Sequence, residues 1–400
     1  MLRREIEEQL AERLVKRIED TNTFILKKIG QAIKQISTLT PSQAYQLSQI
    51  LKYGGSYEEI AKELAKVSGK NVQEIYKIFD EVAKNNKQFA KQFYKYRGID
   101  YIPYTEDSVL KQQVKALASL TANRYRNIAN TSAIGLIQDG RFKQLRVAYQ
   151  EVIDKAILSV SQGKQTFYES MRETLKEIGS NGVVLYESGY KRRLDSAVRM
   201  NMLDGIRQLN QETMNKFGKE YGADGMEISV HINPAPDHAD IQGRQFSIEE
   251  FNKLQDGLEA KDIKNKVYQI THSLNGSYRP IEQYNCYHKA FPVVLGVSEA
   301  EYSDKELEQI KKDNLKGFKY DGNQYTMYEG TQLQRRLETE IRKQKDLQIL
   351  ARASGDNELV QIAQDKISLL SRKYKELCKV SGLQSKAIRM SVSGYRRMKV

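Results

Sequence analysis

The side chains with the richest chemistry are concentrated between Glu227 and Leu295. All four histidines of the chain lie in this stretch, together with one of its two cysteines and four of its six prolines. Imidazole nitrogens and thiolates are the ligands that Zn²⁺ prefers, and the same groups can serve as a base and a nucleophile. The candidate metal ligands are His231, His238, His272, Cys286 and His288.

Three interpretations of this stretch are open. A zinc site would suit the ligand types, although their spacing matches no standard zinc module. A hydrolase would use Cys286 as nucleophile, His238 or His288 as base, and Asp237 or Asp240 to orient that base. In the third interpretation the polar side chains hydrogen-bond the turns of a small, rigid β-containing module. We favour the third, because such residues commonly satisfy buried backbone groups.

Short strands are expected to position these residues. Residues 226–231 and 267–272 have strand character, and Gly243 can adopt a positive φ, so that 244–246 can return as a further strand. If Cys286 and His288 lie on a strand, their side chains point to the same face. A hairpin is expected around Asp321-Gly322, which is a favoured two-residue turn.

The rest of the chain has helical periodicity. Apolar residues recur at helical spacing over 1–37 and in many later stretches, and brief turns separate them. Residues 97–104 break the pattern, and we interpret them as a linker rather than an adhesive aromatic loop. Two charged helices around the turn at 354–357 form a C-terminal αα-hairpin.

These patterns predict a mainly α, elongated multi-helix protein with a small α+β module near residues 226–330. The expected domains are an N-terminal helical region (1–100), a central helical domain (101–225), the α+β module (226–330) and the C-terminal helical hairpin with a basic tail (331–400).

The composition limits the protein class. No run of about 18 apolar residues exists, so no membrane-spanning segment is expected, and the N-terminus lacks the apolar core of a signal peptide. Two cysteines are too few for a disulfide framework, which favours a reducing, intracellular origin. The net charge of +13 favours contact with polyanions.

The positive charge is concentrated near the C-terminus. Between Ser371 and Val400, nine lysines and arginines face a single acid, Glu376. Such a run is either a solvated helix and tail or a contact surface for nucleic acid or an acidic protein. The sequence has no base-reading motif. The candidate contact residues are Arg372, Lys373, Lys375, Lys379, Arg389, Arg396, Arg397 and Lys399.

Several segments resemble a known family. They are GYKRRLDSAVRMNMLDGIRQLNQ, EISVHINPAPDHADIQGRQF, YNCYHKAFPVVLGVSEAEYS and QLQRRLETEIRKQKDLQILARASGD. Between about residues 146 and 383, the chain resembles the phage minor capsid protein 2 family, which is related to the Mu-F-like head-morphogenesis proteins. The motif residues that carry the resemblance, with Cys286 and His288, are Asp237, His238, Ala239, Gln242, Gly243 and Asn285.

The resemblance implies a structural protein of a tailed phage, without catalytic activity. Its expected partners are the portal, the major capsid protein or both, with packaged DNA as a further partner. Its expected location is the capsid interior or the portal region of the virion, after synthesis in the cytoplasm of a bacterial host. The alternatives are a zinc- or cysteine-dependent hydrolase centred on His238, Cys286 and His288, and a nucleic-acid-binding protein that acts outside a virion.

Overall fold

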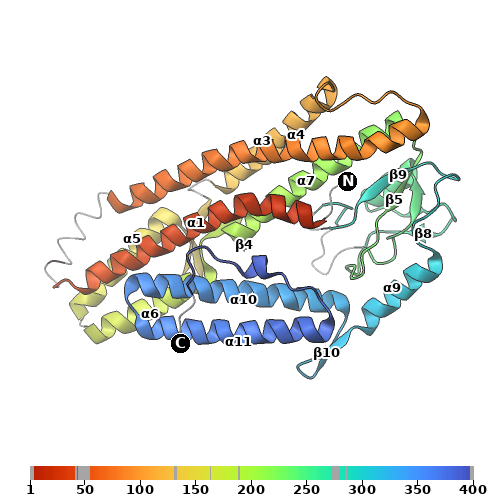
Figure 1. The fold of residues 1–400 in the computed structure, drawn as a ribbon. Helices are drawn as coiled ribbons and strands as arrows, with labels where there is room; N and C mark the ends of the chain where they lie inside the picture. Colours follow the sequence, from red (N-terminus) through yellow and green to blue (C-terminus); the bar gives the residue numbers. More distant parts are fainter. Residues whose placement is uncertain are drawn as a thin grey trace. The chain divides into compact units, whose positions relative to one another are not determined.

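Helices make up most of the fold (Figure 1). The computed structural model describes residues 4–40, 43, 55–129, 133–162, 164–187, 190–271, 279–283 and 286–396. Within this part of the chain the helices are α1 (Arg4–Ser37), α3 (Gly55–Arg97), α4 (Ser108–Ile128), α5 (Leu145–Gln162), α6 (Lys164–Asn181), α7 (Leu194–Glu220), α8 (Ile248–Gln255), α9 (Asp304–Lys316), α10 (Met327–Ser354), α11 (Asn357–Ser381) and the short 3₁₀ helix η1 (Ala387–Met390). The prediction of a mainly α protein is confirmed.

Short antiparallel strands make up small sheets between these helices. They are β1 (Ile134–Gln138), β2 (Arg141–Gln144), β3 (Val184–Glu187), β4 (Tyr190–Arg193), β5 (Gly225–Ile228), β6 (Gln245–Ser247), β7 (Ala260–Lys261), β8 (Val267–Tyr268), β9 (Ala290–Val293), β10 (Phe318–Tyr320) and β11 (Asn323–Tyr325). In the described residues they pair in the orders β2-β1-β3-β4, β6-β5-β9, β7-β8 and β10-β11.

The chain divides into two compact units that each combine distant stretches of sequence. Unit 1 takes the chain up to Ala11, with Glu74–Ala122 and Met200–Gln332. Unit 2 takes Glu12–Gln73, Asn123–Arg199 and the chain from Leu333. The sequence-based division into four consecutive segments stays a prediction. No helix in the described ranges is both long enough and apolar enough to cross a membrane.

Unit 2 contains a four-stranded sheet where the sequence indicated only helices and turns. The turn at Asp139-Gly140, with φ of 49° and 71°, joins β1 to β2, and the fully buried β1 packs against α5 and α6. Each strand of this sheet has four or five residues. The residues of β2 are exposed or half-buried. Strands of four or five residues are too short to show a clear period-two pattern, so the sequence does not distinguish them from the neighbouring helices and turns.

The C-terminal αα-hairpin is confirmed in the same unit. Helices α10 and α11 lie side by side (Figure 1), with the Tyr374 hydroxyl donating to Glu338 and the Gln348 amide donating to Gln364. Asp356 caps α11 by accepting a hydrogen bond from the backbone N–H of Leu359.

A buried ionic network lies within unit 2. Arg193 donates to Asp346 at 2.8 Å, and Asp195 receives hydrogen bonds from Arg342 and from the backbone N–H of Ser196. These carboxylates are almost completely buried. Each therefore depends on its partners to replace the lost hydration.

The expected α+β module lies in unit 1. Strand β5 is central and pairs with β6 on one side and β9 on the other. Ser247 caps α8 through a hydrogen bond from Glu250 N, and the β10–β11 hairpin at Asp321-Gly322 is confirmed. The apolar core of the module consists of Met226, Ile228, Ile241, Phe246, Phe251, Leu254, Ala260, Ile270, Ile281, Cys286 and Ala290.

Two tyrosines of the segment between α3 and α4, Tyr101 and Tyr104, pack on α3. Tyr104 is buried and donates a hydrogen bond to Asp80 at 2.8 Å, and the ring of Tyr101 lies edge-on to that of Tyr94. The segment thus connects α3 to α4 and also buries aromatic surface within unit 1, and its role as a linker between domains stays a prediction.

Candidate functional site

The pairing of β5 brings two distant segments to the same end of the sheet. The loop from β5 to β6 carries His231, His238 and Gln242, and the residues just before β9 include Cys286 and His288. Because Ile228, the last residue of β5, pairs with Ala290, the first of β9, the loop and the second segment meet there. Cys286 and His288 lie just before β9 and outside any strand, so the condition for a shared strand face is not met.

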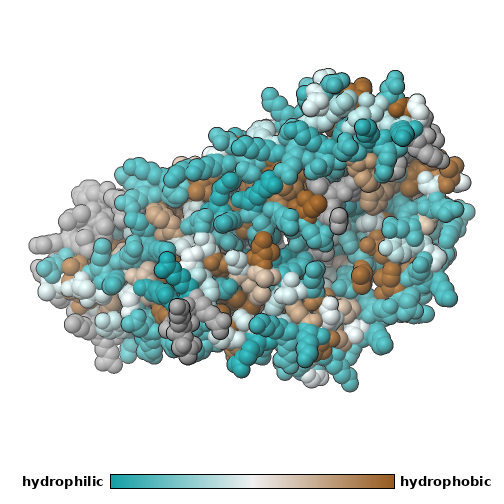
Figure 2. Space-filling view, in the orientation of Figure 1, coloured by the Kyte–Doolittle hydropathy of each residue, from teal (hydrophilic) through white to brown (hydrophobic). Residues whose placement is uncertain are grey.

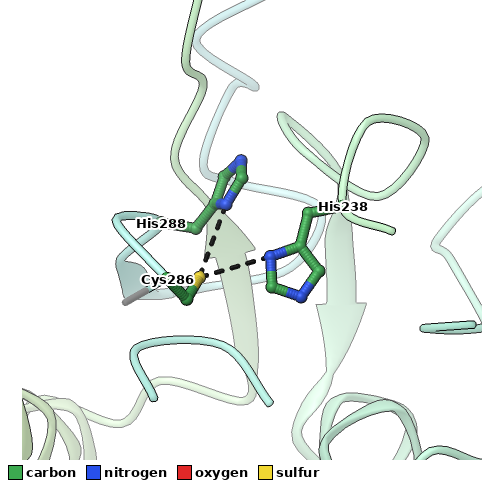
Figure 3. Close-up of side chains that lie close together, drawn as sticks. All are labelled: His238, Cys286 and His288. Carbon is green, nitrogen blue, oxygen red and sulfur yellow. Dashed lines mark hydrogen bonds between the residues drawn. The ribbon is translucent and has the colours of Figure 1, made fainter. Parts of the chain in front are cut away.

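Three side chains of these segments converge on one point (Figure 3). Cys286 Sγ lies 3.3 Å from His238 Nδ1 and 3.5 Å from His288 Nδ1. The three atoms all lie within 4.8 Å of one another. The residues are buried, with exposed fractions of 0% for His238, 2% for Cys286 and 3% for His288. The cluster is therefore shielded from bulk water.

Hydrogen bonds on the far side of each ring fix its orientation. His238 Nε2 lies 2.8 Å from the carbonyl oxygen of Arg279, and His288 Nε2 lies 3.2 Å from Gln242 Oε1. Gln242 Oε1 also accepts from the backbone N–H of His231, which identifies it as the oxygen of the amide. Because both acceptors require an N–H donor, we assign the ring protons to Nε2. An unprotonated Nδ1 of each ring then faces the thiol.

Burial disfavours the charged form of all three groups. It raises the pKa of the Cys286 thiol to about 11. Burial also lowers the pKa of His288 well below its ordinary value, and the neighbouring His231 and His238 act in the same direction. The pKa of His238 is lowered mainly by burial as well. A nucleophilic cysteine needs a lowered thiol pKa, so these surroundings do not activate Cys286 for catalysis.

The aspartates that a hydrolase would use have other partners. Arg279 Nη2 and Nε donate to the two carboxylate oxygens of Asp237 at 2.6 Å and 3.0 Å. Asp237 Oδ2 lies 4.0 Å from His238 Nε2, beyond hydrogen-bond distance. The carboxylate of Asp240 is exposed and pairs with Lys311. The expected nucleophile–base–aspartate chain is therefore not formed.

The structure thus brings together three of the five candidate ligands. His231 is half-buried and lies beside them, with its ring centroid 4.4 Å from that of His288. His272 and Asn285 lie outside the described residues. Among the remaining motif residues, Ala239 is half-buried, and Gly243 turns the chain toward β6 with φ of 67°.

Arg279 is the contributor that the sequence did not reveal. It contacts Asp237 through its side chain and His238 through its carbonyl. It lies 42 positions from Asp237, and an arginine before a proline has no pattern that predicts such a contact. The family motif at Gln242, in contrast, did mark a residue that touches the cluster.

The candidate polyanion-contact residues are divided between two elements and the tail. Arg372, Lys373, Lys375 and Lys379 are exposed on α11, whose opposite face packs in unit 2 through residues such as Leu359, Ile367 and Leu377. Arg389 is half-buried in η1, and Arg396 is exposed after it. Arg397 and Lys399 lie outside the described residues.

Comparison with protein families gives a match over nearly the whole chain. The family described as phage minor capsid protein 2 matches residues 5–379. This range includes the first hundred residues, which the resemblance seen in the sequence did not cover. No curated protein and no solved structure matches the chain significantly.

Proposed function

This chain belongs to the phage minor capsid protein 2 family, and we propose that it binds the portal or the inner face of the capsid within the virion. The family match over residues 5–379 is the observation that carries this proposal. A structural role also agrees with the burial of the histidine–cysteine cluster.

The surface is compatible with binding to other macromolecules. In the face that Figure 2 draws, hydrophilic side chains prevail, and apolar ones form small, separated groups. Interfaces that are not permanent are about as polar as the rest of a protein surface. Exposed apolar residues on α11, Leu369 and Val380, stand among its basic side chains and give that helix a mixed surface.

The test is to locate the chain in purified particles. Mass spectrometry of washed virions should detect it, and chemical cross-linking should join its lysines to the portal or the major capsid protein. A tagged portal expressed with this chain should retain it during purification, whereas an unrelated tagged oligomer should not. Absence of the chain from infectious particles would contradict the proposal.

A second candidate function is contact with packaged DNA through α11. Arg372, Lys375 and Lys379 are exposed at spacings of three and four residues, so they share a helix face. Lys373 adds a further exposed basic side chain to this helix. Lysine and arginine neutralise phosphates and need no base-reading motif, which fits the composition of this helix.

Charge-neutralising variants can test the DNA contact. The variant R372Q/K375Q/K379Q should reduce the slope of log affinity against log salt by about 2.7 if each side chain contacts a phosphate. The matched control is K305Q/K312Q/K316Q, which removes the same charge from exposed positions of α9. An equal decrease of this slope in the two variants would show that only net charge matters and would reject α11 as the contact surface.

A further inference from the structure

We propose that His238, Cys286 and His288 bind a Zn²⁺ ion through Nδ1, Sγ and Nδ1. The three atoms come from two chain segments that meet at the end of the β6-β5-β9 sheet. Their types are those of a Cys-His₂ zinc site. The proposal concerns a site inside unit 1 and does not depend on which partner the virion protein binds.

The spacing of the atoms matches the size of the ion. Zn–S bonds of about 2.3 Å and Zn–N bonds of about 2.0–2.1 Å in a tetrahedron place sulfur and nitrogen about 3.5 Å apart. Cys286 Sγ lies 3.3 Å from His238 Nδ1 and 3.5 Å from His288 Nδ1. The two sulfur–nitrogen distances therefore need only small shifts to fit a zinc ion.

The outer hydrogen bonds distinguish a metal site from a simple hydrogen-bonded cluster. A metal-bound histidine usually donates its other ring N–H to a carbonyl or carboxylate. Both rings have this arrangement, with Arg279 O and Gln242 Oε1 as the acceptors. Each ring then directs a lone pair at Cys286 Sγ, but a thiol has one proton and can satisfy only one of them. A cation between the three atoms satisfies both.

Binding requires one proton to leave. With their ring protons on Nε2, the imidazoles bind through Nδ1 without losing a proton, whereas the thiol of Cys286 gives its proton to solvent as the Zn–S bond forms. The thiolate offsets one of the two positive charges of the ion. Water or the ring of His231, next to that of His288, completes the fourth position. The bound ion fastens the β5–β6 loop to the segment before β9.

The experiment measures metal in the full chain. Protein produced with added zinc and purified without chelators should contain one zinc ion per chain by elemental mass spectrometry. The C286S variant should lose it, whereas C378S, which removes the other cysteine from α11, should retain it. Substitution with Co²⁺ should give thiolate-to-cobalt absorption and tetrahedral d–d bands in the parent and C378S proteins, but not in C286S.

Two further measurements test the proposal even if the C286S variant does not fold. If circular dichroism shows that C286S is unfolded, H288Q, which keeps the thiol, should bind Co²⁺ more weakly and with altered d–d bands. Chelator treatment of the parent protein, followed by Co²⁺, should restore the thiolate absorption. A parent protein that contains no zinc and gives no thiolate band with Co²⁺, or one in which the metal is lost only in C378S, overturns the proposal.

Discussion

Arg279 clamps Asp237 by two hydrogen bonds, from Nη2 at 2.6 Å and from Nε at 3.0 Å. The carbonyl oxygen of the same arginine lies 2.8 Å from Nε2 of His238, the residue after Asp237. Arg279 therefore holds the β5–β6 loop through Asp237 and also orients the imidazole ring of His238. This makes Arg279 a positioning residue for the proposed metal site.

Loss of this clamp should weaken zinc binding without removing a ligand. We expect D237N to lower zinc affinity about 10–100-fold, since changes to groups that orient metal-bound histidines have effects of this size. Competition with a chromophoric chelator measures the affinity, and the stoichiometry at saturating zinc should stay at one. The control is D240N, which disturbs only an exposed pair with Lys311. Unchanged affinity in D237N would show that Arg279 does not orient His238.

The turn at Gly243 should tolerate no side chain. Its φ of 67° costs an L-residue about 1–2 kcal/mol, and an added Cβ would lie 2.6 Å from Cδ2 of Leu307. The free energy of unfolding of G243A should therefore fall by about 1–2 kcal/mol for the backbone strain and by about 1–3 kcal/mol more for the close contact. The control G296A has φ of 75° but no atom within 4 Å, so it should show the backbone cost alone. Denaturant unfolding measures the free energy of unfolding of both variants. Equal decreases in G243A and G296A would exclude the steric contribution.

The buried ionic network in unit 2 should depend on Asp195. This carboxylate accepts from Arg342 and lies 3.3 Å from Arg193 Nε. D195A leaves two buried guanidinium groups without it, which should cost about 3–5 kcal/mol in the free energy of unfolding. D365A, at an exposed position of α11, should change it by less than about 0.5 kcal/mol. If the free energy of unfolding falls as little in D195A as in D365A, the ionic network does not depend on Asp195.

Glu19 should make unit 2 less stable as pH rises. Burial raises the pKa of Glu19 to about 8, and the nearby Asp195 raises it further, while Arg199 and Arg342 oppose the shift. Between about 4.5 and about 8 the folded state then holds a proton that the unfolded state has released. Since stability falls with pH wherever the folded state binds more protons, the stabilising contribution is complete below about pH 4.5 and is lost toward pH 8.

The variant E19Q isolates this effect from other titrating groups. The unfolding free energy of the parent minus that of E19Q should decrease across the same pH window and be level on both sides of it. Urea unfolding at several pH values measures the difference. Glu282 in unit 1, whose pKa burial also raises to about 8, is present in both proteins and cancels. A difference that is flat with pH would show that Glu19 ionises normally.

Local signals in the sequence predicted local structure well. Ser303 and Glu306 form a capping box at the start of α9, as a Ser-x-x-Glu pattern favours, and the Asp321-Gly322 hairpin forms as expected. Ser298 and Glu301 have the same Ser-x-x-Glu spacing, but Ser298 Oγ accepts from Val294 N in a turn and starts no helix. Asp139-Gly140 is an equally good hairpin signal, and it forms the turn between β1 and β2.

The candidate site shows why non-local structure was harder to predict. Five plausible ligands can be identified in the sequence, but nothing in it selects His238, Cys286 and His288 from them. That choice depends on the pairing of β5 with both β6 and β9, which joins residues far apart in the chain. The contribution of Arg279 depends on the same pairing, because its contacts span about forty positions.

The separation of His238 from Cys286 by 48 positions has a consequence for biosynthesis. Standard zinc fingers hold all their ligands within roughly 25 residues, so they can capture metal as soon as that short peptide leaves the ribosome. Here a nascent chain offers only Cys286 and His288 together until the sheet has closed. Metal uptake would consequently be a late event that only a correctly folded subunit completes before it joins the particle.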